Sequence, residues 1–280
     1  MRISRLDLDG AGSPAALVTR ILQVEPDMPV PVPIEQLSRQ LDITSIADLE
    51  TEGFEAALVT DECKSAGAIL VAKGRSGQRR RFSIAHELGH FLIPAHLPRA
   101  GQPSLCSAEH LRAADPGHED RRRRTEAEAN RFAALLLMPP PVLRAELQKI
   151  RRPEVADITR LARLFDVSKD ALARAYAEYT REAVAIIVIR HGHVARFYRN
   201  ERNFPWLAVA RGQSVPAGSA YYSSLTAAAA SRTEECEADL WLGEADARKV
   251  ASMTEQVLHQ QEGFALLMLH ADILDDDDGE

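Results

Sequence analysis

The sequence predicts an α+β fold in more than one domain. Helical periodicity dominates the first part of the chain, two short apolar runs interrupt it, and Ala183–Ile189 form an unbroken apolar stretch typical of a buried strand. The 280 residues exceed the roughly 150 of a typical domain. We therefore expect a core at residues 1–145, a helical extension at 146–180 and a smaller α/β domain at 181–280.

Composition and charge exclude several classes of protein. The chain is 45% hydrophobic and 27% charged, as soluble globular proteins are. Its apolar stretches are shorter than the ~20 residues that cross a bilayer, and its start lacks the apolar region of a signal peptide. Three widely spaced cysteines favour a reducing cytoplasm over a disulfide scaffold. The net charge of −7 excludes a wholly basic nucleic-acid coat but not a local basic patch.

The first elements are short and clearly bounded. Ser13 and Pro14 have the residue types of an N-cap and a first helical position, and a run of prolines ends the apolar periodicity that follows. Ile34–Leu41 form a second short helix. Phe54–Thr60 and Ala66–Ala72 are apolar runs separated by polar residues, which predicts a β-hairpin or two neighbouring strands.

Helices dominate the middle of the chain. Phe82–Ile93 form a helix that ends before Pro94, and residues 94–120, rich in Pro, Gly and His, form a long functional loop or insertion. Thr125–Met138 form a strong helix that three consecutive prolines stop. Two further helices are predicted at Val142–Ile150 and Ile158–Thr180.

The last hundred residues differ in pattern and in charge. After the strand at Ala183–Ile189 we expect short strands, a helix from about Glu244 to Gln261 and a closing strand at Phe264–Leu269. Residues 183–233 hold six arginines against one acidic residue, whereas residues 234–280 hold two basic residues against fourteen acidic ones. The first of these segments is suited to a polyanion, and the second would repel one.

The main chemical signal is His86-Glu87-Leu88-Gly89-His90. Positions four apart on a helix differ by about 40° in direction, so both imidazoles share one face. Two such histidines can bind Zn²⁺, with Glu87 beside the water that zinc activates. A chance match on a solvated helix is the alternative, but the apolar neighbours make this helix buried, and buried polar side chains need partners.

The helix at Thr125–Met138 offers a third ligand. Glu126 and Asn130 lie four apart on one helix face, whereas Glu128 points about 200° away from Glu126. We choose Glu126 as the ligand, with Asn130 hydrogen-bonded to one of the histidines. Glu128 is expected to face solvent or to pair with an arginine among residues 121–124. The alternative for Glu126 is an ordinary acidic residue in a first helical turn.

Two segments resemble the ImmA/IrrE family of zinc metallopeptidases. They are Arg-Arg-Phe-Ser-Ile-Ala-His-Glu-Leu-Gly-His and Glu-Ala-Glu-Ala-Asn-Arg-Phe-Ala-Ala-Leu-Leu-Leu-Met-Pro, and the resemblance covers about residues 50–180. It implies a gluzincin-like zincin domain, a helix-turn-helix-like extension and, at residues 181–280, a GAF-like sensor domain. It also implies a cytoplasmic endopeptidase that cleaves a partner helix-turn-helix repressor in DNA-damage or anti-phage responses. The long insertion at residues 94–124 departs from the family pattern.

The implied mechanism is zinc-dependent hydrolysis with Glu87 as the catalytic base. Glu87 would take a proton from the attacking water and pass it to the leaving amine. An extended substrate is expected to pair with a strand such as Ala66–Ala72.

Cys106 lies in the insertion between His90 and Glu126. It is either an inert loop residue or an inhibitory fourth ligand, because a thiolate binds zinc strongly at ~2.3 Å. Three loop histidines are rival occupants of that position: His96, His110 and His118.

Two segments are candidates for nucleic-acid binding. Arg196, Arg199 and Trp206 lie in a stretch that alternates basic and aromatic residues, which suits single-stranded DNA as an activator. An amphipathic hairpin with aromatic residues in its core explains the same stretch equally well. In Ile158–Ala175, the apolar positions favour packing on the peptidase core or docking of the repressor over base recognition.

The main alternative function belongs to another class. The chain would then be a non-catalytic, zinc-stabilised regulator that binds DNA or protein. Glu87 distinguishes the two readings, because a structural zinc site needs no base beside its ligands.

Overall fold

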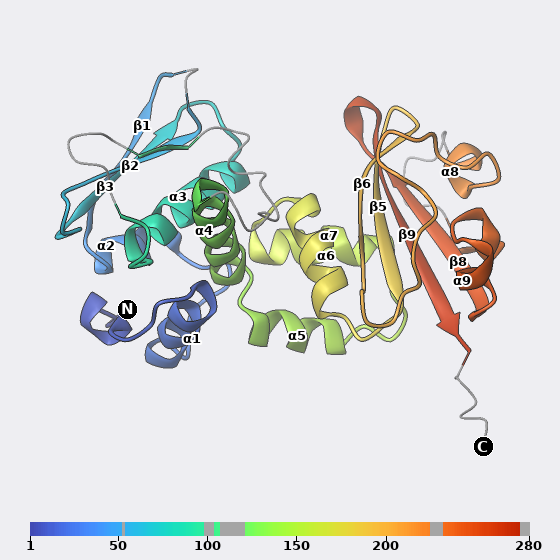
Figure 1. Cartoon of the computed structure of the whole chain (residues 1–280), viewed down its shortest axis with the longest axis horizontal. Helices are drawn as coiled ribbons and strands as arrows, with labels where there is room; N and C mark the ends of the chain where they lie inside the picture. The colour runs from blue at the N-terminus through green and yellow to red at the C-terminus, as the bar shows by residue number, and fades with distance from the viewer. Residues whose placement is uncertain (52–53, 98–103, 107–120, 225–231, 275–280) are drawn as a thin grey trace. The chain divides into compact units, whose positions relative to one another are not determined.

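The computed structural model describes residues 1–51, 54–97, 104–106, 121–224 and 232–274 (Figure 1). Two compact units are present. The first comprises Met1–Pro139 with Leu164–Ser168, and the second comprises Pro140–Arg163 with Lys169–Glu280. The fold is mixed α+β, as predicted, and the second unit is rich in β-sheet.

The first unit begins with the helices that the sequence predicts. A short 3₁₀ turn, η1 (Arg5–Leu8), precedes α1 (Pro14–Val24). The Ser13 hydroxyl caps α1 by accepting a hydrogen bond from the Ala16 amide at 3.3 Å. The helix α2 (Ile34–Gln40) follows and buries Ile34 and Leu37.

A four-stranded sheet in the order β1-β3-β2-β4 forms the other layer of this unit. The predicted hairpin is confirmed, because β2 (Ala56–Thr60) and β3 (Gly67–Ala72) pair antiparallel. Strand β4 (Ser104–Cys106) pairs antiparallel with the outer edge of β2. Strand β1 (Ile43–Leu49) was not predicted, because its apolar residues do not alternate with polar ones. Most of its residues are exposed, and its place depends on parallel pairing with β3.

This topology corrects one expectation about substrate binding. The segment Ala66–Ala72 was expected to pair with an extended peptide, but β3 lies between β1 and β2 and pairs with both. Neither edge of β3 is therefore open to a substrate strand, because its backbone hydrogen-bonding groups already have partners.

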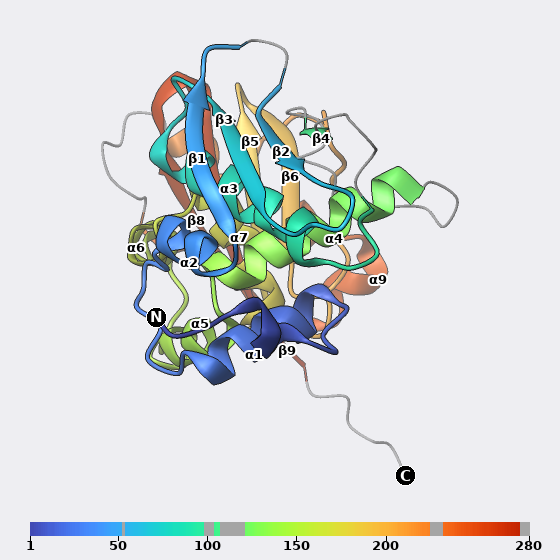
Figure 2. The same cartoon turned by 90° about the vertical axis from the view of Figure 1, so that its left-hand side faces the viewer.

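The helices α3 (Gly77–Leu92) and α4 (Arg121–Leu137) pack against each other, and α3 packs against β2 and β3 (Figures 1 and 2). The approach of α3 to α4 is close at Gly89. A Cβ atom on Gly89 would lie 3.0 Å from Cδ1 of the buried Phe132. Glycine in the His-Glu-Leu-Gly-His motif thus lets α4, which carries Glu126, lie against the histidine helix.

The second unit combines helices with an antiparallel sheet. The helices α5 (Pro140–Gln148), α6 (Val155–Phe165) and α7 (Lys169–Tyr179) come first. The single helix predicted at Ile158–Thr180 is thus divided, and Asp166, with φ of 51°, lies at the turn. The sheet order is β6-β5-β9-β8-β7, with strands β5 (Val184–Arg190), β6 (His193–Arg199), β7 (Glu234–Glu235), β8 (Val250–His259) and β9 (Phe264–Ile273).

The strands predicted at Ala183–Ile189 and Phe264–Leu269 are confirmed as β5 and β9, but the helix predicted from Glu244 to Gln261 is wrong. Only α9 (Glu244–Ala247) is helical there, and most of the remainder is β8. Strand β8 pairs with β9 along its length and with β7. Pairing with β7 and with β9, the next strand along the chain, outweighs local propensity, which is a weak determinant of strands.

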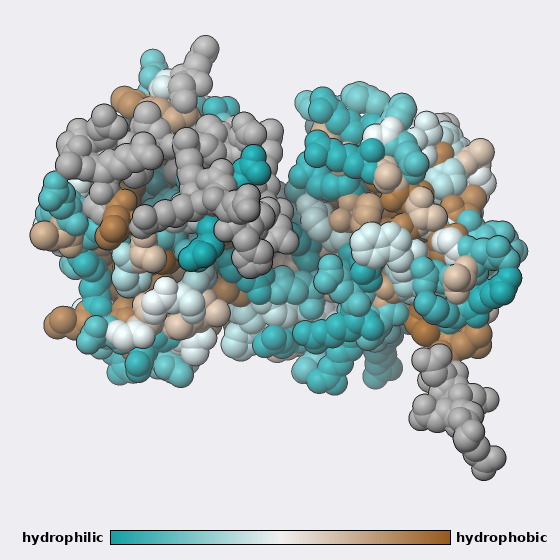
Figure 3. Space-filling model, viewed as in Figure 1, coloured by the Kyte–Doolittle hydropathy of each residue, from teal (hydrophilic) through white to brown (hydrophobic). Residues whose placement is uncertain are grey.

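One face of the sheet of the second unit carries a large apolar cluster. Side chains of β5, β8 and β9 pack there around the fully buried Trp241. The helix α7 packs against β5 and β6, and a short helix, α8 (Ala220–Ser223), contacts β8. On the face drawn in Figure 3, polar and apolar residues of the described segments are interspersed. Among the described residues, no helix has the length and hydrophobicity needed to cross a bilayer.

Candidate metal centre

The helix α3 presents two histidines on one buried face. The Ser76 hydroxyl caps its start by accepting from the Arg79 amide at 3.3 Å, and the helix ends at Leu92, shortly before Pro94. His86 and His90 lie one turn apart and are 0% and 8% exposed. Their Nε2 atoms are 3.1 Å apart, so both imidazoles aim at the same point.

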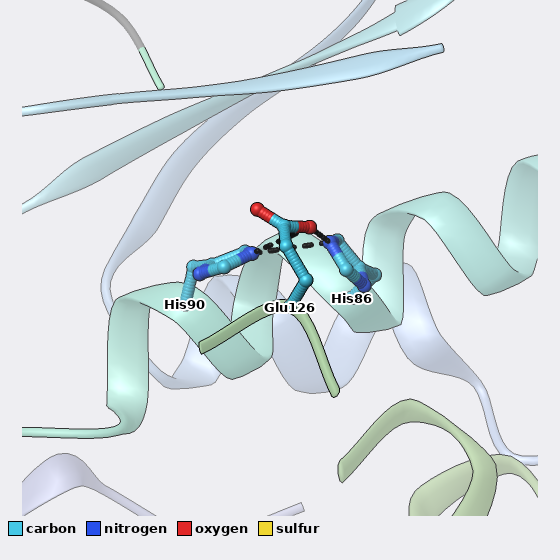
Figure 4. Close-up of side chains that lie close together, drawn as sticks. All are labelled: His86, His90 and Glu126. Carbon is cyan, nitrogen blue, oxygen red and sulfur yellow. Dashed lines mark hydrogen bonds and ion pairs between the residues drawn. The ribbon is translucent and has the colours of Figure 1, made fainter. Parts of the chain in front are cut away.

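Glu126 reaches this point from α4 (Figure 4). Its Oε2 atom lies 3.3 Å from His86 Nε2 and 3.7 Å from His90 Nε2. Ligands arranged tetrahedrally around zinc at ~2.0–2.1 Å are about 3.3–3.4 Å from one another. The three side chains therefore fit a metal ion with the dimensions of zinc. They are the set chosen from the sequence, and the structure brings all three together.

Electrostatics favour the protonation states that metal binding requires. Burial lowers the pKa of both His86 and His90, although Glu126 opposes the shift. Burial raises the pKa of the Glu126 carboxyl, but its contacts with the two imidazoles outweigh this effect and hold the pKa below its usual value. Neutral imidazoles beside an ionised carboxylate form the donor set of a metal site.

Asn130 and Glu87, the two other residues that the sequence assigned to the site, lie beside the candidate ligands. Asn130, one turn after Glu126, accepts a hydrogen bond through Oδ1 from His86 Nδ1–H at 2.9 Å. This is the contact with a candidate ligand expected for Asn130. Glu87 is fully buried on α3 directly after His86.

His96, which the sequence offered as a rival fourth ligand, contacts His90 instead. Its Nδ1 atom lies 3.0 Å from His90 Nδ1, and its Nε2 atom lies 2.9 Å from Glu128 Oε2. Burial, followed by the nearby His90, lowers the pKa of His96 to about 4. The predicted partner of Glu128, an arginine, is also present, because Arg124 lies 3.8 Å from its other oxygen.

Lys64 is a neighbour of the site that the sequence did not reveal. Its buried ammonium group donates hydrogen bonds to the carbonyl oxygens of His90 and Ile93, at 2.7 and 2.9 Å. Burial, followed by the charge of Arg5, lowers the pKa of Lys64 to about 8. A cation at the carboxyl end of α3 interacts favourably with the helix dipole and holds the backbone that carries His90. A single lysine between two strands has no motif that would have indicated this role.

Cys106, the candidate inhibitory ligand, ends strand β4, where its backbone pairs with Ala56. Its side chain lies outside the described residues, as do His110 and His118. Of the rival occupants, only His96 is described, and it contacts the Nδ1 side of the His90 ring, whereas the metal group is formed by Nε2.

The three candidate nucleic-acid contacts separate into two places in the second unit. The guanidinium of Arg199 stacks on the exposed Trp206 ring at 4.7 Å. Arg196 instead forms an ion pair with Asp170 of α7, at 3.1 Å. The two arginines lie on opposite faces of the sheet. Arg199 pairs with Ala185, whose side chain belongs to the apolar cluster. Arg196 lies on the face against which α7 packs.

Comparisons with known proteins concern the domain in which these residues lie. Residues 46–176 match the family model of the IrrE N-terminal-like domain, Peptidase M78. No curated protein matches the chain. A solved structure of a Mycobacterium tuberculosis transcriptional regulator resembles it with a TM-score of 0.50 and 14% identity, over 84% of this chain and 68% of that one; this likeness concerns the fold alone. Residues 46–176 are therefore an IrrE N-terminal-like domain, and the chain carries a metallopeptidase-like domain of the kind found in the ImmA/IrrE family.

Proposed function

We propose that this chain is a zinc-dependent endopeptidase that cleaves a partner helix-turn-helix transcriptional repressor and so derepresses stress or defence genes. The observation that carries the proposal is the convergence of His86, His90 and Glu126 at tetrahedral spacing, with the buried Glu87 next in sequence to the first of them. A structural zinc site would not need Glu87. The proposal therefore gives the three side chains the role of zinc ligands and Glu87 that of catalytic base.

Each residue of the site has its own role in the proposed peptide hydrolysis. Zinc bound by the two histidines and Glu126 would lower the pKa of a water molecule and polarise the scissile carbonyl. Glu87 accepts the proton of the attacking water and donates it to the leaving amine. Asn130 fixes the ring of His86 so that its Nε2 lone pair faces the metal. Three protein ligands leave a coordination position for the substrate.

A regulatory role is supported by the family and by the fold. One solved structure with a similar fold is a transcriptional regulator, and the sequence resembles peptidases that act on repressors. In the proposed arrangement, the helices at residues 146–180 are a helix-turn-helix-like extension and residues 181–280 are a GAF-like sensor. The five-stranded antiparallel sheet with α7 against one face supports such a sensor domain.

The test is cleavage of a defined protein. A small helix-turn-helix protein encoded beside this chain would be purified and incubated with the zinc-loaded chain, and the fragments identified by mass spectrometry. We expect one or a few cuts, which a zinc chelator stops and added zinc restores. Intact repressor at equimolar enzyme, together with zinc-dependent binding of that repressor, would instead support the non-catalytic regulator.

The inhibitory role of Cys106 remains part of the proposal. Strand β4 places its backbone at the edge of the sheet that packs on α3. A thiolate delivered from that edge would fill the position that the substrate needs.

Single-stranded DNA is the proposed activator, and the contacts of the three candidate residues rank their expected contributions. We expect an oligonucleotide to stimulate repressor cleavage and the Arg196→Ala/Arg199→Ala/Trp206→Ala variant to lose the stimulation. Arg199 and Trp206 should contribute more than Arg196, because Asp170 already pairs with Arg196. The stimulation should fade as salt rises, since phosphate contacts release counterions.

Cleavage rates with and without oligonucleotide, over a range of salt, measure this effect. Equal rates in the wild-type chain would remove DNA as the activator. Stimulation that survives the triple substitution would move the binding site, most plausibly to the arginines at residues 121–124.

A further inference from the structure

The two candidate histidine ligands have different partners behind them. The ring of His86 is held by an amide oxygen, that of Asn130. The ring of His90 is held by His96, which in turn contacts the carboxylate of Glu128. His96 is 6% exposed, and its ring centre lies 4.9 Å from that of His90. Two hydrogen bonds thus run in series from the candidate metal point to α4.

The chemistry of the atoms determines where the protons lie in this series. If His90 offers the lone pair of Nε2 to a metal, its proton is on Nδ1 and can be donated to His96 Nδ1. His96 Nδ1 is then an acceptor, so the proton of that ring is on Nε2. It points at Glu128 Oε2, 2.9 Å away, and a carboxylate accepts it. With both imidazoles neutral and Glu128 ionised, each atom has one role, and Nε2 of His90 is left with the lone pair that a metal needs.

Both outer partners come from the helix that also carries Glu126. Glu126, Glu128 and Asn130 occupy alternate positions on α4. Asn130 is one turn from Glu126 and reaches His86 directly. Glu128 points to another side of α4 and reaches His90 only through His96, which follows the end of α3. The position of His96, within a tight turn that links its amide to the Ile93 carbonyl at 3.1 Å, makes this bridge available.

We propose that His96 and Glu128 are positioning residues that fix the ring of His90 and strengthen it as a metal ligand. The inference rests on the proposed function only in that the metal binds at His86, His90 and Glu126. A hydrogen bond that ends on a carboxylate draws the Nδ1 proton of His90 outward and raises the electron density on Nε2. Partners of this kind are usually worth 10–100-fold in metal affinity. His96 is therefore not a fourth ligand, because its contact is with the opposite nitrogen of the ring.

Three variants and one control test the proposal. In His96→Leu the series is broken, and the zinc affinity, measured by competition with a chelator, should fall about 10–100-fold. His96→Gln should recover most of the loss, because its amide oxygen can accept from His90 and its amide nitrogen can donate to Glu128. Glu128→Ala removes only the outer partner, whose side chain is 34% exposed, and should cost a few-fold. His193→Leu, at an exposed histidine of β6, should leave the zinc affinity unchanged.

A spectroscopic measurement separates positioning from a general effect on packing. In the chain loaded with Co²⁺, the Nδ1 protons of the two ligands give separate, solvent-exchangeable signals that the paramagnetic ion shifts. We expect His96→Leu to speed the exchange of one signal, that of His90, and to leave the signal of His86 unchanged. Glu128→Ala should shift the same signal. The Glu128 side chain is partly exposed, so this variant should fold even if His96→Leu does not, and it then tests the proposal alone.

The possible failures are distinguishable. Unchanged zinc affinity and unchanged proton exchange in both His96→Leu and Glu128→Ala would overturn the positioning role while leaving the metal site intact. Equal effects on the signals of both ligands would also overturn it, because they would show a general loosening of the site. If the wild-type chain bound neither Zn²⁺ nor Co²⁺, the proposed function itself would be wrong. A chain that binds metal as described but cuts no repressor would leave this inference standing.

Discussion

Replacing Glu87 by glutamine is expected to abolish repressor cleavage while the fold and the bound zinc are kept. The side chain is fully buried beside the candidate ligands, and glutamine fills nearly the same volume. An amide cannot accept the proton of the attacking water, so the step that depends on a general base is lost. A positioned base contributes about 10²–10⁴-fold to a rate, and we expect a loss at the upper end of that range or beyond it.

The measurement is the rate of repressor cleavage by the zinc-loaded variant, with zinc content determined on the same sample. Glu62→Gln makes the same chemical change at an exposed position between β2 and β3 and serves as the control, which should cleave at the wild-type rate. Substantial cleavage by Glu87→Gln with zinc bound would show that Glu87 is not the base.

Replacing both His86 and His90 by alanine should reduce bound zinc from about one ion per chain to almost none. Glu126 alone would then remain of the three candidate ligands, and a single carboxylate holds zinc weakly. Ligand binding stabilises a folded protein by mass action, so zinc should raise the melting temperature of the wild-type chain and not that of the variant. Two truncated buried side chains also leave a cavity, which lowers the stability of the metal-free variant.

Elemental analysis of the purified proteins and thermal melts with and without zinc measure both effects. The matched control is His191→Ala/His193→Ala, which removes two exposed imidazoles from the β5–β6 hairpin. It should bind zinc and respond to it as the wild type does. Undiminished zinc in the His86→Ala/His90→Ala variant would show that the metal binds elsewhere.

The parts of the site that could be predicted from the sequence are those set by helix geometry. The spacing of His86 and His90, and that of Glu126 and Asn130, places each pair on one face of its helix whatever surrounds it. The residue types then indicate a metal. In the structure, the Nε2 atoms of the two histidines and Oε2 of Glu126 meet, and Asn130 contacts His86. The hairpin of β2 and β3 follows in the same way from two apolar runs and a polar turn.

Other features follow from the pairing of one strand with another, which the pattern of a single segment does not show. The helix expected at Glu244–Gln261 is largely β8, because β7 and β9 pair with it. Strand β1 joins its sheet through β3 although most of its residues are exposed. Packing on a sheet is a property of the neighbours as much as of the strand itself. The same pairing removes Ala66–Ala72 from consideration as a substrate edge.

The sequence by itself thus determined the candidate ligands, the candidate base and the α+β class, because these depend on the regular geometry of single helices and strands. Only the tertiary structure decided that Lys64 holds the end of α3, that Gly89 admits Phe132, and that His96 links His90 to Glu128. These contacts join a loop to a helix or one helix to another. No local periodicity encodes them, since they arise when burial brings polar groups together that then require hydrogen-bond partners.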